Sequence, residues 1–184
     1  MGRLMVTSIC SLDGYVADTD GRFDWGEPSA EVHYAVNALE RGVGTQLIGR
    51  RTFELMTYWE TAPTEGDDPY AEFARIWQAL DKVVYSTTLE SVADPRARIV
   101  RSFDPDEVRA LVASSEADVE IGGPTLAAHA WRAGLVDEVR LFLIPIALGG
   151  GLPALPHGVR SHLDLQEQRT FADGTVHLRY AIRR

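Results

Sequence analysis

The chain has 184 residues, of which 45% are hydrophobic and 24% are charged, and its formal net charge is −9. This length and composition are typical of one soluble folded unit with a sizeable core, so we expect a single domain over residues 1–184. The acidic balance argues against nucleic acid as a partner, because phosphate backbones are bound by basic faces.

Cysteine content and apolar runs exclude further classes of protein. The single cysteine, Cys10, rules out an internal disulfide and a cysteine zinc site. No apolar run approaches the ~20 residues that cross a bilayer, and the first ten residues lack the apolar core of a signal peptide. The five histidines show no metal-ligand spacing, so no metal site is predicted. We therefore expect a cytoplasmic protein without a membrane partner.

Strand-like and helix-like segments alternate along the chain. In chain order we expect a strand at 4–10, a helix at 29–40, a strand at 45–48, helices at 51–56 and 69–80, strands at 82–85 and 97–100, a helix from Pro105, a strand at 118–121, a helix at 124–133, a strand at 138–144 and a hairpin of 165–171 with 175–182. The alternation favours an α/β fold with helices on both faces of a central sheet, and the terminal hairpin makes that sheet mixed.

Three of these strands end in glycine, hydroxyl or guanidinium groups. The three segments are Gly49-Arg50-Arg51-Thr52, Ser86-Thr87-Thr88 and Gly122-Gly123-Pro124-Thr125-Leu126. Ligands of α/β sheets bind beyond the carboxyl ends of the strands, and a glycine pair before a helix lets a pyrophosphate approach free N–H groups. Guanidinium and hydroxyl groups at the other two ends suit a second phosphate. Together the three ends predict a dinucleotide that carries an extra phosphate.

Simpler interpretations of these segments stay open. The glycine pair is also typical of a structural turn, and adjacent arginines are common on a solvated helix face. The Rossmann fingerprint G-x-G-x-x-G is absent, so a dinucleotide site here requires a different nucleotide-binding fold.

Five motifs in order carry a resemblance to a known family. They are "SLDGYVA" at 11–17, "IGRRTFE" at 48–54, "VVYSTTL" at 83–89, "IGGPTL" at 121–126 and "VDEVRLFLIPIALGGG" at 136–151. With them the chain resembles the dihydrofolate reductase-like family, and within it the C-terminal reductase domain of bifunctional riboflavin-biosynthesis deaminase-reductase proteins.

The resemblance implies a three-layer fold, a mixed, mostly parallel eight-stranded sheet, a C-terminal β-hairpin, bound NADPH and a homodimer. Residue by residue, it implies that Gly49, Arg50, Arg51 and Thr52 form the phosphate-binding turn and that Ser86 and Thr87 lie on the side of the 2′-phosphate. It implies that the pyrophosphate and nicotinamide side is formed by Gly122, Gly123, Pro124, Thr125 and Leu126.

The sequence departs from riboflavin-pathway reductases at two positions. Their first strand commonly carries a lysine and their glycine pair commonly follows a glutamate, whereas 4–10 has no lysine and Ile121 precedes Gly122. Glu120 lies one residue earlier, and a one-residue shift along a strand points a side chain to the opposite face. These departures bear on the substrate and leave the cofactor side unaffected.

Reduction of a C=N or C=O bond by a hydride also requires a proton, for which the sequence offers two carboxyl groups. Glu31 lies in the first turn of the first helix, and Asp13 lies in the "SLDG" turn. Each has a structural alternative, since a first-turn Glu complements the helix dipole and an Asp before Gly favours a turn.

The sequence thus predicts an NADPH-dependent reductase whose small-molecule substrate is a flat nitrogen heterocycle, either a pteridine or a pyrimidine of the riboflavin pathway. Two alternatives stay open: a true dihydrofolate reductase, and an NADPH-binding module without catalysis.

Overall fold

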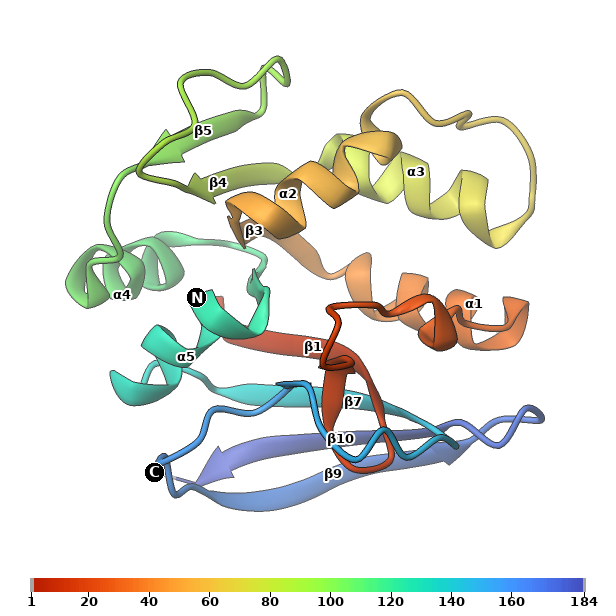
Figure 1. The fold of residues 1–184 in the computed structure, drawn as a ribbon. Helices are drawn as coiled ribbons and strands as arrows, with labels where there is room; N and C mark the ends of the chain where they lie inside the picture. The colour runs from red at the N-terminus through yellow and green to blue at the C-terminus, as the bar shows by residue number, and fades with distance from the viewer. Residues whose placement is uncertain (1, 184) are drawn as a thin grey trace.

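The computed structural model describes residues 2–183 and is built around one eight-stranded sheet with the order β5-β4-β3-β6-β1-β7-β10-β9 (Figure 1). Its strands are β1 (Leu4–Ser11), β3 (Val43–Gly49), β4 (Asp81–Tyr85), β5 (Ala97–Val100), β6 (Asp118–Gly122), β7 (Glu138–Ile144), β9 (His162–Thr170) and β10 (Val176–Arg183). The strands from β5 to β7 are parallel, whereas β10 is antiparallel to both β7 and β9. The predicted mixed, mostly parallel sheet with a C-terminal hairpin is therefore confirmed.

Helices cover both faces of the sheet and complete the three layers (Figure 1). They are α1 (Ala30–Glu40), α2 (Arg50–Met56), α3 (Pro69–Ala79), α4 (Pro105–Ser114) and α5 (Pro124–Arg132). One core cluster joins Val108 of α4 and Trp131 of α5 to the sheet, and another joins Phe53 of α2 and Trp77 of α3 to Met5 of β1. Because side chains alternate across a strand, these clusters define an α4–α5 face and an α1–α3 face.

Helix α1 covers the part of the α1–α3 face that lies toward the C-terminal strands. Val32 of α1 packs with Phe142 of β7 and Phe171, and Ile9 of β1 packs against this cluster. Successive odd-numbered residues of β1, from Met5 through Thr7 to Ile9, therefore point to the α1–α3 face.

A second, two-stranded sheet was not predicted. Strand β2 (Tyr15–Ala17) pairs with β8 (Leu152–Pro153), so the "SLDGYVA" and "LGGG" segments lie against each other. Gly151 has a φ of +140°, and a Cβ there would overlap the carbonyl oxygen of Ala17. The strands are too short to show a period, but this close approach explains why glycine is needed at Gly151.

Two short 3₁₀ helices, η1 (Asp24–Gly26) and η2 (Thr57–Glu60), complete the elements. Strand β9 begins three residues before the predicted position, because polar residues at this sheet edge still pair with β10, as Asp164 does with Ala181. Among residues 2–183, no helix has the length and apolar character to cross a membrane.

Candidate active site at the strand ends

The three polar strand ends lie next to one another at the same edge of the sheet. Strand β3 stands between β4 and β6, with Gly49 opposite Tyr85 and Ile48 opposite Gly122. The residues that follow these positions therefore leave the sheet at adjacent points. The structure thus brings together the segments 49–52, 86–88 and 122–126.

The two helices that start at this edge lack the capping side chains found elsewhere in the chain. Ser29, Asp68 and Asp104 cap α1, α3 and α4 by accepting backbone N–H bonds. In contrast, α2 begins after Gly49 and α5 after Gly123, with no side-chain cap on either. The first N–H groups of a helix have no intrahelical partner, so α5 presents free donors and the positive end of its dipole at this edge.

Gly123 and Thr52 bring the starts of α5 and α2 into contact. Gly123 has a φ of +87° and a ψ of 120°, a conformation that side chains disfavour, and a Cβ there would lie 2.8 Å from Thr52 Oγ1. Gly49 is different: its φ is −77°, and a Cβ there would meet only Leu126 at 4.0 Å. Neither backbone geometry nor packing therefore requires a glycine at position 49.

The two adjacent arginines have different environments. Arg50 donates from Nε to Glu54 at 2.7 Å and from Nη1 to Thr88 Oγ1 at 2.7 Å. Arg51 is exposed and makes no hydrogen bond or ion pair with any residue in 2–183. Arg50 therefore reaches across to the end of β4, while Arg51 remains free on the surface.

The turn after β4 is held by its own hydrogen bonds. The Ser86 hydroxyl accepts the N–H groups of Thr88 at 3.3 Å and Leu89 at 2.9 Å. Arg101 Nη1 donates to the carbonyl oxygens of Ser86 at 3.0 Å and Leu89 at 2.6 Å. Ser86 thus shapes this turn, and Thr87 is left exposed beside it.

The remaining predicted residues of the α5 start divide into two groups. Pro124 occupies the first turn, where it lacks the N–H that other residues would offer, and Thr125 is exposed. The Leu126 side chain packs in the core of the α4–α5 face, so this residue offers only its backbone N–H at the helix start.

Asp13 is fully occupied by contacts that fix the loop after β7. Its carboxylate accepts the Ser11 hydroxyl at 2.7 Å and the N–H groups of Leu148 at 3.1 Å and Gly149 at 2.7 Å. These bonds, led by the one from Ser11, lower the pKa of Asp13 to about 2. Near neutral pH the group is therefore ionised and holds no proton to donate.

Glu31 likewise joins two elements. Its carboxylate accepts Arg169 Nη2 at 2.9 Å and the Ala172 N–H at 3.2 Å. Both partners belong to the β9–β10 hairpin or its turn, so these contacts tie the start of α1 to that hairpin.

Glu120 and Ile121 point to opposite faces of β6, as the one-residue shift predicted. Ile121 is fully buried in the core cluster of the α4–α5 face. The Glu120 carboxylate accepts the Thr7 hydroxyl at 3.0 Å on the α1–α3 face and is hydrogen-bonded to Glu40 at the end of α1. The sequence analysis did not predict that Glu40 is buried beside Glu120, because the only signal was the position of Glu40 at the end of a helix.

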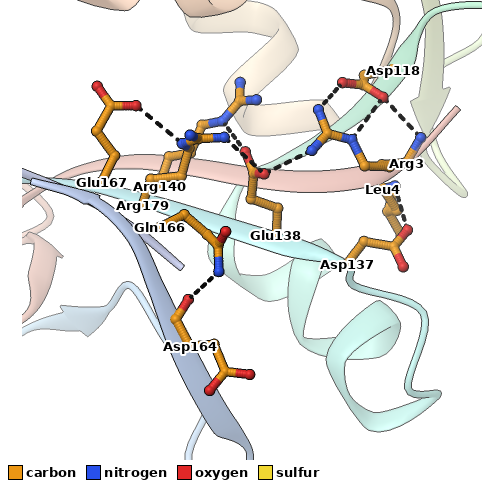
Figure 2. A network of polar contacts seen from close by, with 10 residues as sticks. All are labelled: Arg3, Leu4, Asp118, Asp137, Glu138, Arg140, Asp164, Gln166, Glu167 and Arg179. Atoms are coloured by element: carbon orange, nitrogen blue, oxygen red, sulfur yellow. Dashed lines mark hydrogen bonds and ion pairs between the residues drawn. The ribbon is translucent and has the colours of Figure 1, made fainter. Parts of the chain in front are cut away.

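The opposite edge of the sheet carries ion pairs (Figure 2). The buried Glu138 carboxylate lies between Arg3 at 2.9 Å, Arg140 at 2.7 Å and Arg179 at 3.5 Å. Arg3 also binds Asp118 at 2.6 Å. These pairs join the starts of β1, β6 and β7 to the middle of β10, and they account for the charged groups as parts of the scaffold.

Two hollows flank the sheet. One of about 350 Å³ is lined by residues 60–65 and Gln78, and it lies toward the amino end of β4, away from the polar strand ends. The other, of about 250 Å³, lies between β1, β7 and the loop after β7, and its lining includes Cys10, Leu141, Leu143, Leu155 and His157. Burial raises the pKa of the Cys10 thiol to about 11, so this group is a neutral part of the wall and no thiolate.

Within 2–183, no three His, Cys, Asp or Glu side chains gather to hold a metal ion.

Comparison with known proteins identifies relatives along the whole chain. The profile of the family described as the RibD C-terminal domain matches residues 3–177. The chain is 28% identical over 185 residues to YyaP of Bacillus subtilis, an uncharacterized protein, covering 97% of this chain and 94% of YyaP.

Solved structures share the fold. A candidate riboflavin biosynthesis protein from Shewanella sp. PV-4 aligns with a TM-score of 0.73 and 23% identity, over 99% of each chain. A diaminohydroxyphosphoribosylaminopyrimidine deaminase/5-amino-6-(5-phosphoribosylamino)uracil reductase from Thermotoga maritima aligns with a TM-score of 0.65 and 15% identity, over 99% of this chain and 57% of that one.

Proposed function

Because this chain belongs to the family of the RibD C-terminal domain, we propose that it is an NADPH-dependent reductase of the riboflavin-pathway type. Its substrate would be a flat nitrogen heterocycle or its ribosylamino derivative, such as 5-amino-6-(5-phosphoribosylamino)uracil. The relative from Thermotoga maritima carries that reductase activity in its name. We further propose that the chain acts as a single domain over 1–184 and as a cytoplasmic homodimer.

The observation that carries the cofactor proposal is the uncapped start of α5 beside the polar ends of β3 and β4. The Gly122-Gly123 turn and the free N–H groups of Thr125 and Leu126 would hold the pyrophosphate of NADPH. Arg50, with the turn at Ser86 and Thr87, would hold the 2′-phosphate that distinguishes NADPH from NADH.

The chemistry then divides between cofactor and protein. NADPH supplies the hydride when bound at this edge. The chain binds and orients the dinucleotide through the strand-end segments, and it must also deliver a proton to the reduced atom of the substrate. Asp13 is ionised and fully engaged, so it does not suit that role.

Binding of the cofactor is tested by thermal unfolding with NADPH and with NADH. A ligand at 100 times its Kd stabilises the native state by about 2.7 kcal/mol. We expect NADPH at millimolar concentration to raise Tm clearly, and NADH to raise it less. If NADPH left Tm unchanged, the cofactor proposal would fail.

Turnover separates the alternatives for the substrate. NADPH oxidation is followed by absorbance with the ribosylamino-pyrimidine and, separately, with dihydrofolate. Oxidation with the pyrimidine supports the riboflavin-pathway reductase, and oxidation with dihydrofolate alone supports a dihydrofolate reductase. The first strand has no lysine, and Ile121 stands before the glycine pair. Because both positions bear on the substrate, a third candidate stays open, an NADPH-binding module that oxidises NADPH with neither substrate. Light scattering of the purified chain tests the homodimer, which should have twice the mass of one chain.

A further inference from the structure

Two carboxyl groups lie side by side in the interior, below the candidate active site on the α1–α3 face. Glu40, at the end of α1, is 6% exposed, and Glu120, in β6, is 5% exposed. They are hydrogen-bonded to each other, and neither forms an ion pair with a described lysine or arginine.

The groups that surround the pair do not neutralise two negative charges. Arg140 of β7 attracts both carboxylates at longer range, but its Nε is committed to Glu138 at 2.7 Å (Figure 2). Its Nη1 is buried without a partner. Gln46 of β3 and Thr7 of β1 offer only neutral hydrogen bonds to Glu120. One positive charge therefore faces two buried carboxyl groups.

Under these conditions the pair favours a state in which one proton is shared between its two carboxyl groups. Two adjacent carboxylates in a low-dielectric interior cannot both be ionised without a large penalty. Burial first, and the neighbouring Glu120 second, raise the pKa of Glu40 well above its ordinary value. Burial also raises the pKa of Glu120, although its hydrogen bond from Glu40 opposes that change. Glu40 thus donates the shared hydrogen bond and Glu120 accepts it.

Thr7 connects this pair to the level of the glycine turn. Met5 pairs with Glu120 across the parallel strands, and two further residues along each strand bring Thr7 to the level of Gly122. The Thr7 hydroxyl donates to Glu120 Oε2 at 3.0 Å. Met5 is fully buried, whereas Thr7 and the next residue on this face, Ile9, are partly exposed. Thr7 therefore stands at the partly exposed end of a hydrogen-bonded chain that leads to the buried pair.

We propose that Glu40 and Glu120 hold the proton for the reduction and that the Thr7 hydroxyl delivers it at the α1 side of Gly122. The inference rests on the proposed reductase function. It assigns the proton to groups other than Asp13 and Glu31, whose carboxylates are engaged by the loop after β7 and by the β9–β10 hairpin.

The proton step is balanced as follows. The carbon of the substrate C=N bond gains a hydride with its two electrons, and the nitrogen gains the Thr7 hydroxyl proton. The shared proton first passes from Glu40 to Glu120, and Glu120 then gives it to the Thr7 oxygen as the Thr7 hydroxyl turns its own proton toward the substrate nitrogen. The pair is left as two carboxylates, which take up one proton from solvent through Thr7 before the next turnover.

The first test needs no substrate or cofactor. The carbonyl infrared band of a protonated carboxylic acid is isolated at neutral pH as the difference between the wild-type protein and Glu40→Gln. The band moves when the acid exchanges its proton for deuterium, so transfer into D₂O times the exchange. We expect Thr7→Val to slow this exchange about tenfold or more, equivalent to about 1.4 kcal/mol on the barrier. Thr7→Ser keeps the hydroxyl and should exchange at the wild-type rate.

The outcomes decide between the relay and a purely structural pair. Absence of the band in the wild-type protein, or equal exchange in Thr7→Val and Thr7→Ser, overturns the proposal. Unfolding midpoints of both variants establish that each is folded. Valine and threonine have the same shape, so a folded Thr7→Val protein isolates the loss of the hydroxyl.

A second test uses turnover with the acceptor that the reductase reduces. We expect Thr7→Val to lower kcat about tenfold with KM for NADPH unchanged, and Thr7→Ser to restore it. Unchanged kcat and an unchanged pH profile in Thr7→Val would contradict proton delivery. Failure of NADPH to bind would instead refute the reductase function, and the exchange measurement would still decide whether Thr7 is the path to the pair.

Discussion

Arg50→Ala tests whether the start of α2 recognises the 2′-phosphate of NADPH. Arg50 points to the turn after β4, where Thr88 accepts its Nη1 at 2.7 Å, so a phosphate placed among these groups would meet the guanidinium. A hydrogen bond to a charged group contributes about 1.5–3 kcal/mol, and the half-exposed Arg50 side chain favours the lower end. We therefore expect NADPH binding to weaken by about 10-fold, equivalent to about 1.4 kcal/mol, with NADH binding nearly unchanged.

The existing ion pair of Arg50 supplies a matched control. Its bond to Glu54 at 2.7 Å spans one helical turn and is exposed, and such pairs contribute only about 0.3–0.5 kcal/mol. A phosphate can displace so weak a partner. Glu54→Gln should therefore leave the fold intact and tighten NADPH binding by about twofold, because it releases Arg50 without removing it.

The assay is a titration of each variant with NADPH and with NADH, at low and at physiological salt. Arg51→Ala provides the second control, since the Arg51 side chain has no partner in 2–183 and points away from its neighbour by about 100°. Equal losses for both cofactors in Arg50→Ala would refute the reasoning, as would weaker NADPH binding in Glu54→Gln. Either result would mean that the two arginines belong to a solvated helix face and do not recognise the 2′-phosphate.

Three further predictions concern the scaffold of the site. Gly123→Ala should lower the free energy of unfolding by about 1–3 kcal/mol in chemical denaturation, because φ is +87° and the new Cβ meets Thr52; a loss below about 0.5 kcal/mol would contradict this. The low pKa of Asp13 means that its contribution is present above about pH 4 and lost as pH falls toward 2, so the protection of the Leu148 amide against hydrogen exchange, relative to its intrinsic rate at each pH, should fall over that range. Asp13→Asn should abolish that pH dependence, and an unchanged profile would refute the assignment. Because the pKa of Glu40 is raised in the folded protein, the free energy of unfolding should fall as pH rises, by up to about 1.4 kcal/mol per pH unit. Glu40→Gln should flatten this dependence in urea unfolding between pH 5 and 9. A slope equal to that of the wild-type protein would count against a shared proton.

The adjacency of the three polar strand ends was predictable because its signals are local. Each of the three segments follows its own strand directly, and parallel strands of one sheet end at the same edge. The sequence therefore needed only the alternation of strands and helices to place Gly49, Tyr85 and Gly122 near one another. The face of Glu120 was predictable for the same reason, since alternation along one strand decides it.

The environments of the carboxyl groups were not predictable, because their partners lie far away in the sequence. Asp13 stands in an ordinary Asp-Gly turn, and nothing within that turn indicates that Leu148 and Gly149 occupy its carboxylate. Glu40 reads as a polar residue at a helix end, and only the docking of α1 on the sheet brings it to Glu120, 80 positions later. Long-range contacts of this kind leave no periodic signal for sequence reasoning to detect.

In this chain Ile121 directly precedes the glycine pair and the carboxylate stands one residue earlier, at Glu120. This order affects how a substrate that accepts the hydride can be recognised. Ile121 is fully buried against Leu126 in the core of the α4–α5 face, so no polar group of an acceptor can be recognised from that side chain. The carboxyl group at Glu120 is turned to the other face, where it accepts a hydrogen bond from the partly exposed Thr7. On the proposed relay, an acceptor bound beside Thr7 would meet a hydroxyl that is backed by the proton shared between Glu40 and Glu120. Such a relay would favour an acceptor whose C=N nitrogen needs a proton, and the comparison of pyrimidine and pteridine turnover would show which acceptor that is.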